Sequence, residues 1–369
     1  MTTSTHRLRS IALGAAAAAL AFTGMTPAGA WGAQGHQYVG SLAWALLNAN
    51  ARAHVAALLG ANVGLTHAAV WPDCVRSVNA SADGTFTFTV DKYTSKACNV
   101  FADGGAEQAR MTDYASRNWT NCEYSGQRTK CNLAYHFADV NVKIHNRYDE
   151  GYFGAGSGDV VQAIKAAITV LGCLEGQTCP TAGPFNIKDK REALFLLTHF
   201  MGDLHQPLHV GAVYLDGSNA AGDDHGRATT GGNALLLKSG RGGENLHHSW
   251  DEIAPGLGTT PSAAAIARGC RIAYGPASAT GSPESWASES VIAASAAYKG
   301  LTYTPDSGQK NHWDVKVGNA QAYSKARTKT QADQLIKAGA RLAMVLNTMW
   351  PSSTAAPACG GSLTPRPHG

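Results

Sequence analysis

One mostly apolar segment, residues 197–209, constrains this chain more than any other feature, because it contains four ionisable side chains: His199, Asp203, His205 and His209. His199 and Asp203 have i, i+4 spacing, so on a helix they lie on one face about one turn apart. His247 and Asp251 repeat that spacing later in the chain. Imidazole nitrogens and carboxylate oxygens are zinc ligands in proteins. The two pairs therefore predict helices that carry a multi-zinc site with hydrolytic chemistry.

Residues 1–30 have the organisation of a secretory signal peptide. A basic start is followed by a short apolar run, residues 11–22, and the segment ends in the small-residue sequence Ala28-Gly29-Ala30. A membrane anchor is the alternative, but the apolar run is too short to span a bilayer. We therefore expect a mature chain that begins at Trp31 and is secreted or periplasmic. Cleavage would free an α-amino group with a pKa of about 7.7–8.0, which is a good metal ligand, close to His36.

Composition narrows the class of protein further. Charged residues make up 15% of the chain and hydrophobic residues 44%, which indicates a compact globular fold. Removing the signal peptide with its two arginines lowers the formal net charge from +4 to +2, too little to predict nucleic-acid binding from charge alone. Eight cysteines in an exported chain indicate disulfides. Cys173 with Cys179 and Cys122 with Cys131 are close enough to pair, and the other pairings stay open. A cysteine zinc site is the alternative, but no C-x-x-C pair is present.

Hydrophobic periodicity predicts a mainly α, single compact multi-helix domain with a few short strands, extending over residues 31–350. Helices are expected over residues 37–59, 160–174, 191–204, 262–274, 285–298 and 320–349. The last of these has an apolar face that should be core: Leu335, Ala338, Leu342 and Val345. Short strands are expected over residues 85–90 and 233–238, and a Gly- and Asp-rich loop over 213–232. Residues 79–132 are interpreted as a decorated insertion, and residues 351–369 as a tail that Cys359 could anchor.

Several motifs follow one another from Trp31 to Asp251: Trp31-Gly32…Gly35-His36, Trp71-Pro72-Asp73, His136-Phe137-Ala138-Asp139, residues 199–209, Gly231-Gly232-Asn233, and Asn245-Leu246-His247…Trp250-Asp251. In this order they resemble the secreted zinc-dependent single-strand nucleases and 3′-nucleotidases, the family of the fungal P-one and S-one nucleases. Several ordered motifs are more specific than any one of them. The resemblance implies the phospholipase C and nuclease P-one fold, with a trinuclear zinc site in a cleft.

The resemblance also implies which residues hold the three zinc ions. The first ion would be held by Asp73, His136, His199 and Asp203. The second would be held by the amine and carbonyl of Trp31, by His36, and by Asp203 as a bridge. The third would be held by His209, His247 and Asp251. His205 is not an implied ligand and is expected to make a supporting hydrogen bond.

Substrate-binding residues are implied in the same way. Arg76 would bind the phosphate and would form the catalytic group with Asp73 and Asp203. Phe137 would stack on a base and Asp139 would hydrogen-bond it, with Asn233 as a weaker candidate for the base site. Structural alternatives stay open, namely Arg76 as a surface ion-pair partner, Phe137 as a core residue, and Asp139 as an orienting partner of His136.

The expected activity is zinc-dependent hydrolysis of single-stranded DNA and RNA to 5′-phosphate products by a monomer, with 3′-nucleotides as further substrates. Zinc would activate a water molecule for attack on phosphorus. An unpaired base can enter a pocket that a paired base reaches only by unstacking, which favours single strands. A zinc phospholipase C acting on phosphatidylcholine is the closest alternative, but its last ligand is a glutamate where this chain has Asp251. A zinc-binding protein without catalysis is the other, and it would need no Arg76 beside the metal.

Overall fold

The computed structural model describes residues 31–61, 63–90, 95–122, 129–174, 176–177, 179–181, 183–220, 226–237, 244–275, 281–353 and 359. The predicted signal peptide and most of the predicted tail lie outside these residues. The α-helices are α1 (Ala33–Leu46), α2 (Ala49–Leu59), α3 (Leu65–Ala68), α4 (Trp71–Val75), α5 (Ala106–Arg117), α6 (Val160–Gly172), α7 (Lys190–His205), α8 (Leu246–Asp251), α9 (Ala263–Ala273), α10 (Pro283–Ala297) and α11 (Ala320–Met349). Among the described residues, none of the helices combines the length and the apolar character needed to cross a membrane.

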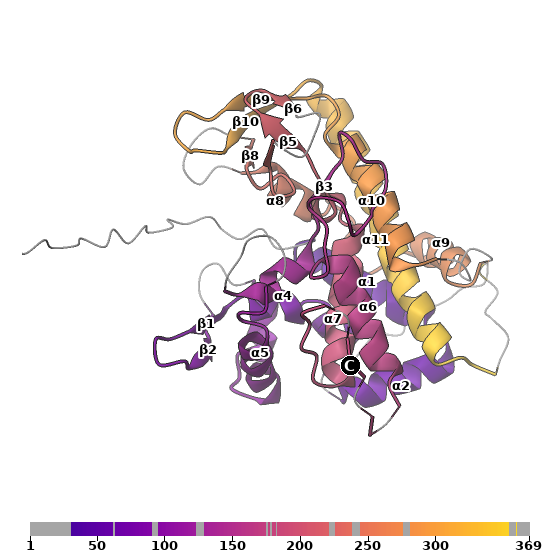
Figure 1. Cartoon of the computed structure of the whole chain (residues 1–369). Coiled ribbons are helices and arrows are strands. Elements are labelled where there is room, and N and C mark those ends of the chain that lie inside the picture. Colours follow the sequence, from indigo (N-terminus) through magenta and orange to yellow (C-terminus); the bar gives the residue numbers. More distant parts are fainter. Residues whose placement is uncertain are drawn as a thin grey trace, which may run out of the picture.

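Helix α7 lies at the centre of the fold. All its residues from Glu192 to His205 are buried, as expected for a helix that other helices surround. It packs against α6, α11, α3 and α10. Figure 1 shows α6 beside it. The Asp189 carboxylate caps the helix by accepting a hydrogen bond from the Glu192 N–H. Pro207 lies beyond its end, at the start of the 3₁₀-helix η3 (Pro207–His209), so the helix predicted over 191–204 is confirmed.

The other long helices agree with the sequence patterns except at the beginning of the chain. The single helix predicted over 37–59 is wrong, because the chain turns at Leu47 and begins a second helix, α2. Asn48 caps α2, since its side chain accepts a hydrogen bond from the Ala51 N–H. Helices α6, α9, α10 and α11 are confirmed. On α11, Leu335, Ala338 and Leu342 are buried as predicted, whereas Val345 is half-buried.

The strands are short and form small sheets around the helical core: β1 (Val78–Ala80) with β2 (Phe86–Phe88), β3 (Val140–Asn141) with β4 (Gly211–Ala212), β6 (Asn219–Ala220), β5 (Tyr214–Asp216) and β7 (Arg227–Ala228) together, and β8 (Leu235–Leu236), β10 (Trp313–Val317) and β9 (Leu301–Pro305) together. The strands predicted over 85–90 and 233–238 correspond to β2 and β8. The loop predicted over 213–232 is wrong where the chain is described, because β5 lies there and pairs antiparallel with β6 and β7, and residues 221–225 lie outside the described residues. The sequence patterns did not predict the antiparallel hairpin of β9 and β10.

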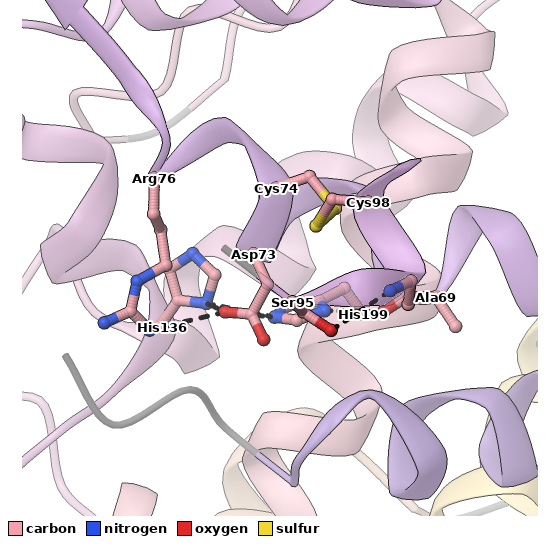
Figure 2. Close-up of a disulfide and its surroundings, with 9 residues drawn as sticks. Ala69, Asp73, Cys74, Arg76, Ser95, Cys98, His136 and His199 are labelled. Atoms are coloured by element: carbon pink, nitrogen blue, oxygen red, sulfur yellow. Dashed lines mark hydrogen bonds and ion pairs between the residues drawn. A yellow bond between two sulfur atoms is a disulfide. The ribbon is translucent and has the colours of Figure 1, made fainter. Parts of the chain in front are cut away.

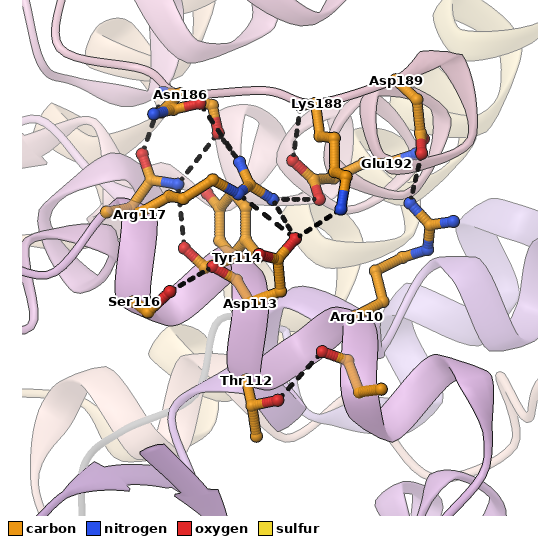
Figure 3. Close-up of polar contacts among 12 residues, drawn as sticks. Arg110, Thr112, Asp113, Tyr114, Ser116, Arg117, Asn186, Lys188, Asp189 and Glu192 are labelled. Carbon is orange, nitrogen blue, oxygen red and sulfur yellow. Dashed lines mark hydrogen bonds and ion pairs between the residues drawn. The ribbon is translucent and has the colours of Figure 1, made fainter. Parts of the chain in front are cut away.

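The described parts of the predicted insertion, residues 79–90, 95–122 and 129–132, contain regular elements, and their longest element is α5. Met111, Tyr114 and Ala115 on α5 are buried, and the helix packs against α4 and β2. Ion pairs attach α5 to the start of α7, as Figure 3 shows for Arg110, Arg117 and their partners. The insertion is therefore an integral part of the core that supports α7.

All eight cysteines form disulfides. Cys122–Cys131 and Cys173–Cys179 are paired as predicted. The two pairings that the sequence left open are Cys74–Cys98 and Cys270–Cys359. The first of these ties the insertion to α4, and the second ties Cys359 to α9.

Candidate metal centre

The first side-chain group consists of four residues from three elements. His199 and Asp203 come from α7, Asp73 comes from α4, and His136 comes from the 3₁₀-helix η2 (Cys131–His136). One oxygen of Asp203, Oδ2, lies 3.0 Å from His136 Nδ1 and 3.2 Å from His199 Nε2. Asp73 Oδ1 lies 4.0 Å from His136 Nδ1 and 3.8 Å from His199 Nε2. Figure 2 shows Asp73 between the two imidazoles, with Arg76 alongside. The structure thus brings together the four residues implied for the first ion.

A second group forms around His36 on α1. Its Nε2 lies 3.3 Å from the other oxygen of Asp203, Oδ1, and its ring stacks on the His199 ring with centroids 3.8 Å apart. This approach requires a glycine at position 202, because a Cβ there would lie 2.7 Å from His36 Nδ1. Trp31 is fully buried next to the same glycine. Gly202 was not predicted as a site residue, although a glycine in a helix interior is itself a signal, since it costs about 1 kcal/mol relative to alanine.

The third group lies at η3 and α8. His247 Nε2 is 3.0 Å from His209 Nε2 and 3.5 Å from Asp251 Oδ2. The second oxygen of Asp251 accepts a hydrogen bond of 2.7 Å from the Gln206 amide. The candidate ligand atoms of His209, His247 and Asp251 all lie within 4.8 Å of one another. These are the three residues implied for the third ion.

Backbone carbonyls fix the orientation of three of these imidazoles. The Nδ1–H groups of His199, His209 and His247 donate to the carbonyl oxygens of Ala69, His136 and Gly231, at 2.6, 2.8 and 2.8 Å. A neutral imidazole with its hydrogen on Nδ1 presents a lone pair on Nε2. The Nε2 atoms of His209 and His247 are therefore acceptors that point into the polar cluster. His199 differs, because Asp203 and Asp73 raise its pKa although burial opposes this, so its Nε2 can carry a hydrogen and donate it to Asp203 Oδ2 at 3.2 Å. Ala69 and Gly231 contribute only backbone to this arrangement, so no side-chain pattern in the sequence could have identified their role.

The resulting arrangement fits bound cations. The Nε2 atoms of His209 and His247 face each other at 3.0 Å, and burial lowers the pKa of His247 to about 3 and also lowers that of His209. Both rings are therefore neutral, and their two lone pairs repel unless a positive ion lies between them. Among the described residues, buried polar atoms without a hydrogen-bond partner include both ring nitrogens of His36, Asp203 Oδ1 and Asp251 Oδ2. Such groups are costly to bury unless something satisfies them, and their nitrogen and oxygen donors suit zinc.

Electrostatics within the cluster favour an ionised Asp203. Burial opposes its ionisation, but the charge of His199 and a hydrogen bond from His136 hold its pKa well below the usual range. Asp251 is the opposite case, because burial raises its pKa well above the usual range despite the hydrogen bond from Gln206. A cation in the third group would stabilise the ionised form of Asp251.

The cluster reaches solvent at Asp73 and Arg76, whose side chains are 16% and 18% exposed. Arg76 Nη1 lies 3.4 Å from Asp73 Oδ1. Arg76 therefore does form an ion pair, as the structural alternative for this residue expected. Phe137 is half-buried, and Asp139 is buried. Burial raises the pKa of Asp139 to about 7, opposed by a hydrogen bond from the Gly231 backbone. Asn233 follows Gly231 closely in sequence, and its side-chain amide donates to the Thr230 carbonyl at 2.8 Å.

His205 differs from the other histidines of α7. Its Nδ1–H donates to the Met201 carbonyl at 2.7 Å, and its Nε2 accepts a hydrogen bond of 2.9 Å from Arg341. Burial, together with the charge of Arg341, holds the pKa of His205 well below its usual value. His205 therefore makes hydrogen bonds, but neither of its partners is a candidate metal ligand. Its contact with Arg341, a residue of α11, attaches α7 to the helical core.

Comparisons with known proteins agree on one kind of enzyme. A family model described as S1/P1 Nuclease matches residues 31–351. Endonuclease 4 of Arabidopsis thaliana is 44% identical over 62 residues, which are 17% of this chain and 16% of that protein. Endonuclease 1 of the same plant is 42% identical over 60 residues, 16% of this chain and 15% of that protein. The matched segments therefore span less than a fifth of these curated relatives.

Proposed function

This chain belongs to the S1/P1 nuclease family, and from that premise we propose that it is an exported, zinc-dependent hydrolase of phosphodiester bonds. Its proposed substrates are single-stranded DNA and RNA, cleaved to 5′-phosphate products, and 3′-nucleotides. The observation that carries the proposal is the pair of neutral imidazoles, His209 and His247, whose lone pairs face each other at 3.0 Å inside a buried carboxylate cluster. Four disulfides support the proposed export, because they persist in oxidising compartments.

We propose three zinc sites with the ligand sets that the sequence implied, in which Asp203 serves two ions. The geometry that supports sharing is that Asp203 Oδ1 faces His36 while Oδ2 faces His136 and His199. Zinc ions bound there would act as Lewis acids and lower the pKa of a water molecule enough to supply a nucleophile near neutral pH. The protein's own contribution is to fix the imidazoles through carbonyl hydrogen bonds and to exclude bulk water from the cluster.

The proposed second site also needs the amine of Trp31. Trp31 is buried beside Gly202, and the next residue is anchored by a hydrogen bond of 2.8 Å from the Gly32 N–H to the Asp251 carbonyl. These contacts hold Trp31 next to His36. A mature protein with one extra residue before Trp31 should therefore bind less zinc and lose activity. Normal zinc content and normal rate in that protein would exclude amine ligation.

Arg76 is proposed to bind the scissile phosphate. Its charge contributes, after that of His199, to lowering the pKa of Asp73. The same charge also favours lower pKa values for His247 and Asp251, so the guanidinium lies near both the first and the third group. A guanidinium in that position can form two parallel hydrogen bonds to phosphoryl oxygens. It can also stabilise the charge that develops on them in the transition state.

The base is proposed to lie against Phe137 and Asp139, with Asn233 as a further contact. Phe137 is half-buried, which leaves part of its ring accessible for stacking. Since the pKa of Asp139 is about 7, its carboxyl group can donate or accept a hydrogen bond near neutral pH. A base reaches such a site only when it is unpaired, which supports a preference for single strands.

The test is cleavage of single-stranded DNA, duplex DNA and phosphatidylcholine by the mature protein, as purified, after chelation, and after zinc is restored. We expect zinc-restorable cleavage of the single strand, with 5′-phosphate ends and little cleavage of the duplex. Cleavage of phosphatidylcholine alone would assign the protein to phospholipid hydrolysis. Bound zinc without any cleavage would leave a metal-binding protein and would refute the proposed function.

A further inference from the structure

Three side chains of the insertion meet on the surface and form what we call the basic aromatic patch: Phe86, Trp119 and Lys130. The ring of Phe86, on β2, meets the ring of Trp119 edge to face, with centroids 5.1 Å apart. Lys130 Nζ lies 5.6 Å from the centroid of the Trp119 ring and donates a hydrogen bond of 2.8 Å to Asn79 Oδ1. All three side chains of the patch are half-buried, so each presents part of its surface to solvent.

The patch adjoins the candidate metal centre along two segments of chain. Lys130 immediately precedes η2, which ends at His136. Asn79, the hydrogen-bond partner of Lys130, follows Arg76 by three residues, a span of at most about 11 Å. Burial lowers the pKa of Lys130, and the charge of Arg76 lowers it further, which agrees with this proximity.

Covalent and backbone constraints hold the patch in place. Cys131, next to Lys130, is bonded to Cys122, and its N–H donates to the Trp119 carbonyl at 3.2 Å. Lys130 itself has the left-handed backbone conformation, with φ of 55°. The disulfide and the backbone hydrogen bond therefore hold a cation and an aromatic ring together near Arg76, which lowers the entropic cost of binding a ligand.

An ammonium group beside an accessible aromatic ring has the chemistry of a site for single-stranded nucleic acid. Proteins bind such strands by stacking bases on aromatic rings and by pairing phosphates with cations. We propose that Trp119 and Lys130 form a second nucleotide subsite, which binds the nucleotide next to the one held at the metal centre. The base would stack on Trp119 and the phosphate would pair with Lys130, while Phe86 keeps the indole in position. This inference rests on the proposed function and deepens it.

The experiment compares wild type with Trp119→Ala and Lys130→Met as zinc-loaded mature proteins. Cleavage of an oligothymidylate and of a 3′-nucleotide is measured, because only the oligonucleotide reaches both subsites. We expect the ratio of kcat/KM on the oligonucleotide to kcat/KM on the 3′-nucleotide to fall about tenfold in Trp119→Ala. In Lys130→Met, the slope of log Kd against log salt for a nuclease-resistant phosphorothioate oligothymidylate should flatten by about 0.7, the value for one lost phosphate contact to a single strand.

Lys188→Met is the matched control for the loss of one surface cation. Lys188 is 59% exposed and pairs with Asp113, in the ion-pair network where α5 meets the start of α7. Its variant should keep the wild-type ratio and salt slope. Trp119→Phe and Lys130→Arg should restore most of the lost binding, because they keep the ring and the charge.

A structural role for the patch predicts a different result. Thermal unfolding would then shift in Trp119→Ala and Lys130→Met, while the activity ratio and the salt slope stayed at wild-type values, and this would overturn the subsite. Failure of the proposed function is distinguishable, because wild type would then cleave neither substrate. Phosphorothioate binding still tests the patch in that case, and equal Kd and salt slope in all variants would overturn it.

Discussion

Helix α7 contains two buried polar regions that differ in how their charges are satisfied. At its beginning, Glu192 is fully buried, with one carboxylate oxygen accepting from Arg117 at 2.7 Å and the other from the Lys188 N–H at 2.9 Å (Figure 3). Three turns later, Asp203 is equally buried, yet its Oδ1 has no hydrogen-bond partner among the described residues. Both ring nitrogens of the neighbouring His36 also lack a hydrogen-bond partner within that part of the chain, although Nε2 lies 3.3 Å from Asp203 Oδ1.

The difference separates a structural charge from a functional one. A buried carboxylate whose oxygens are both satisfied inside the protein needs nothing more, so the pair with Arg117 is explained by the attachment of α5 to α7. Buried carboxylate and imidazole atoms that lack a hydrogen-bond partner carry an unpaid desolvation cost that a bound cation would offset. The two regions are alike in burial and in charge. They differ in how many of their buried polar atoms have a hydrogen-bond partner in the protein.

The largest expected effect comes from Asp203→Asn. An amide cannot supply the charge that two proposed ions share, so activity on single-stranded DNA should fall at least about 1000-fold, or about 4 kcal/mol of activation free energy. Zinc content, measured on the purified protein, should fall with it. Full zinc occupancy and wild-type rate in this variant would refute the bridging role and remove the contrast between the two regions.

The same carboxylate-to-amide change at Glu192 should act on stability instead. Glu192→Gln leaves the Arg117 guanidinium without its buried partner and should lower the free energy of unfolding by about 3 kcal/mol, measured by urea denaturation. Zinc content and kcat should stay at wild-type values. The double variant Glu192→Met, Arg117→Met is the control, because removing both charges should restore part of the stability. Loss of zinc in Glu192→Gln would mean that the two regions are coupled.

Asp139 is an intermediate case, since it is buried with a backbone partner, Gly231. Its pKa of about 7 in the folded protein exceeds the unfolded value of about 3.9. The folded state therefore binds more protons between these values, and stability falls as pH rises through that window. In metal-free protein, Asp139→Asn should be more stable relative to wild type at pH 8 than at pH 5, by at least about 1 kcal/mol. Parallel stability profiles for the two proteins would contradict the raised pKa.

The smallest effect on stability is expected at the exposed edge of the ion-pair network around Glu192. Asp113 is 39% exposed and pairs with Arg117 and Lys188. Asp113→Asn should change the free energy of unfolding by less than about 1 kcal/mol, and by less still at high salt, because solvent screens such pairs. Thermal unfolding at low and high salt checks this. A loss as large as that of Glu192→Gln would show that the whole network, rather than the buried carboxylate, attaches α5.

Much of the helical scaffold was predictable because it depends on local periodicity. The spacing of His199 and Asp203 predicted one helix face, and both residues lie on α7 with their side chains in contact. The break at Leu47 was not predictable in this way, since alanines and leucines continue through it and a single capping residue, Asn48, decides it. Strand β8 was also weakly specified, because it pairs with β10, which lies far along the chain.

The components of the candidate site could be read from the sequence alone: the i, i+4 pairs, the ordered motifs and the cysteines. These are local features, and each fixes which chemistry a segment can offer. How these components are arranged could be seen only in the fold, because the contacts that arrange them join distant segments. The carbonyl that orients His199 comes from Ala69, 130 residues away, and Cys270 is bonded to Cys359 across 89 residues. Such pairings depend on which surfaces become buried together. A hydrophobic pattern records side-chain polarity, so it cannot show the role of a backbone carbonyl or of the absence of a Cβ at Gly202.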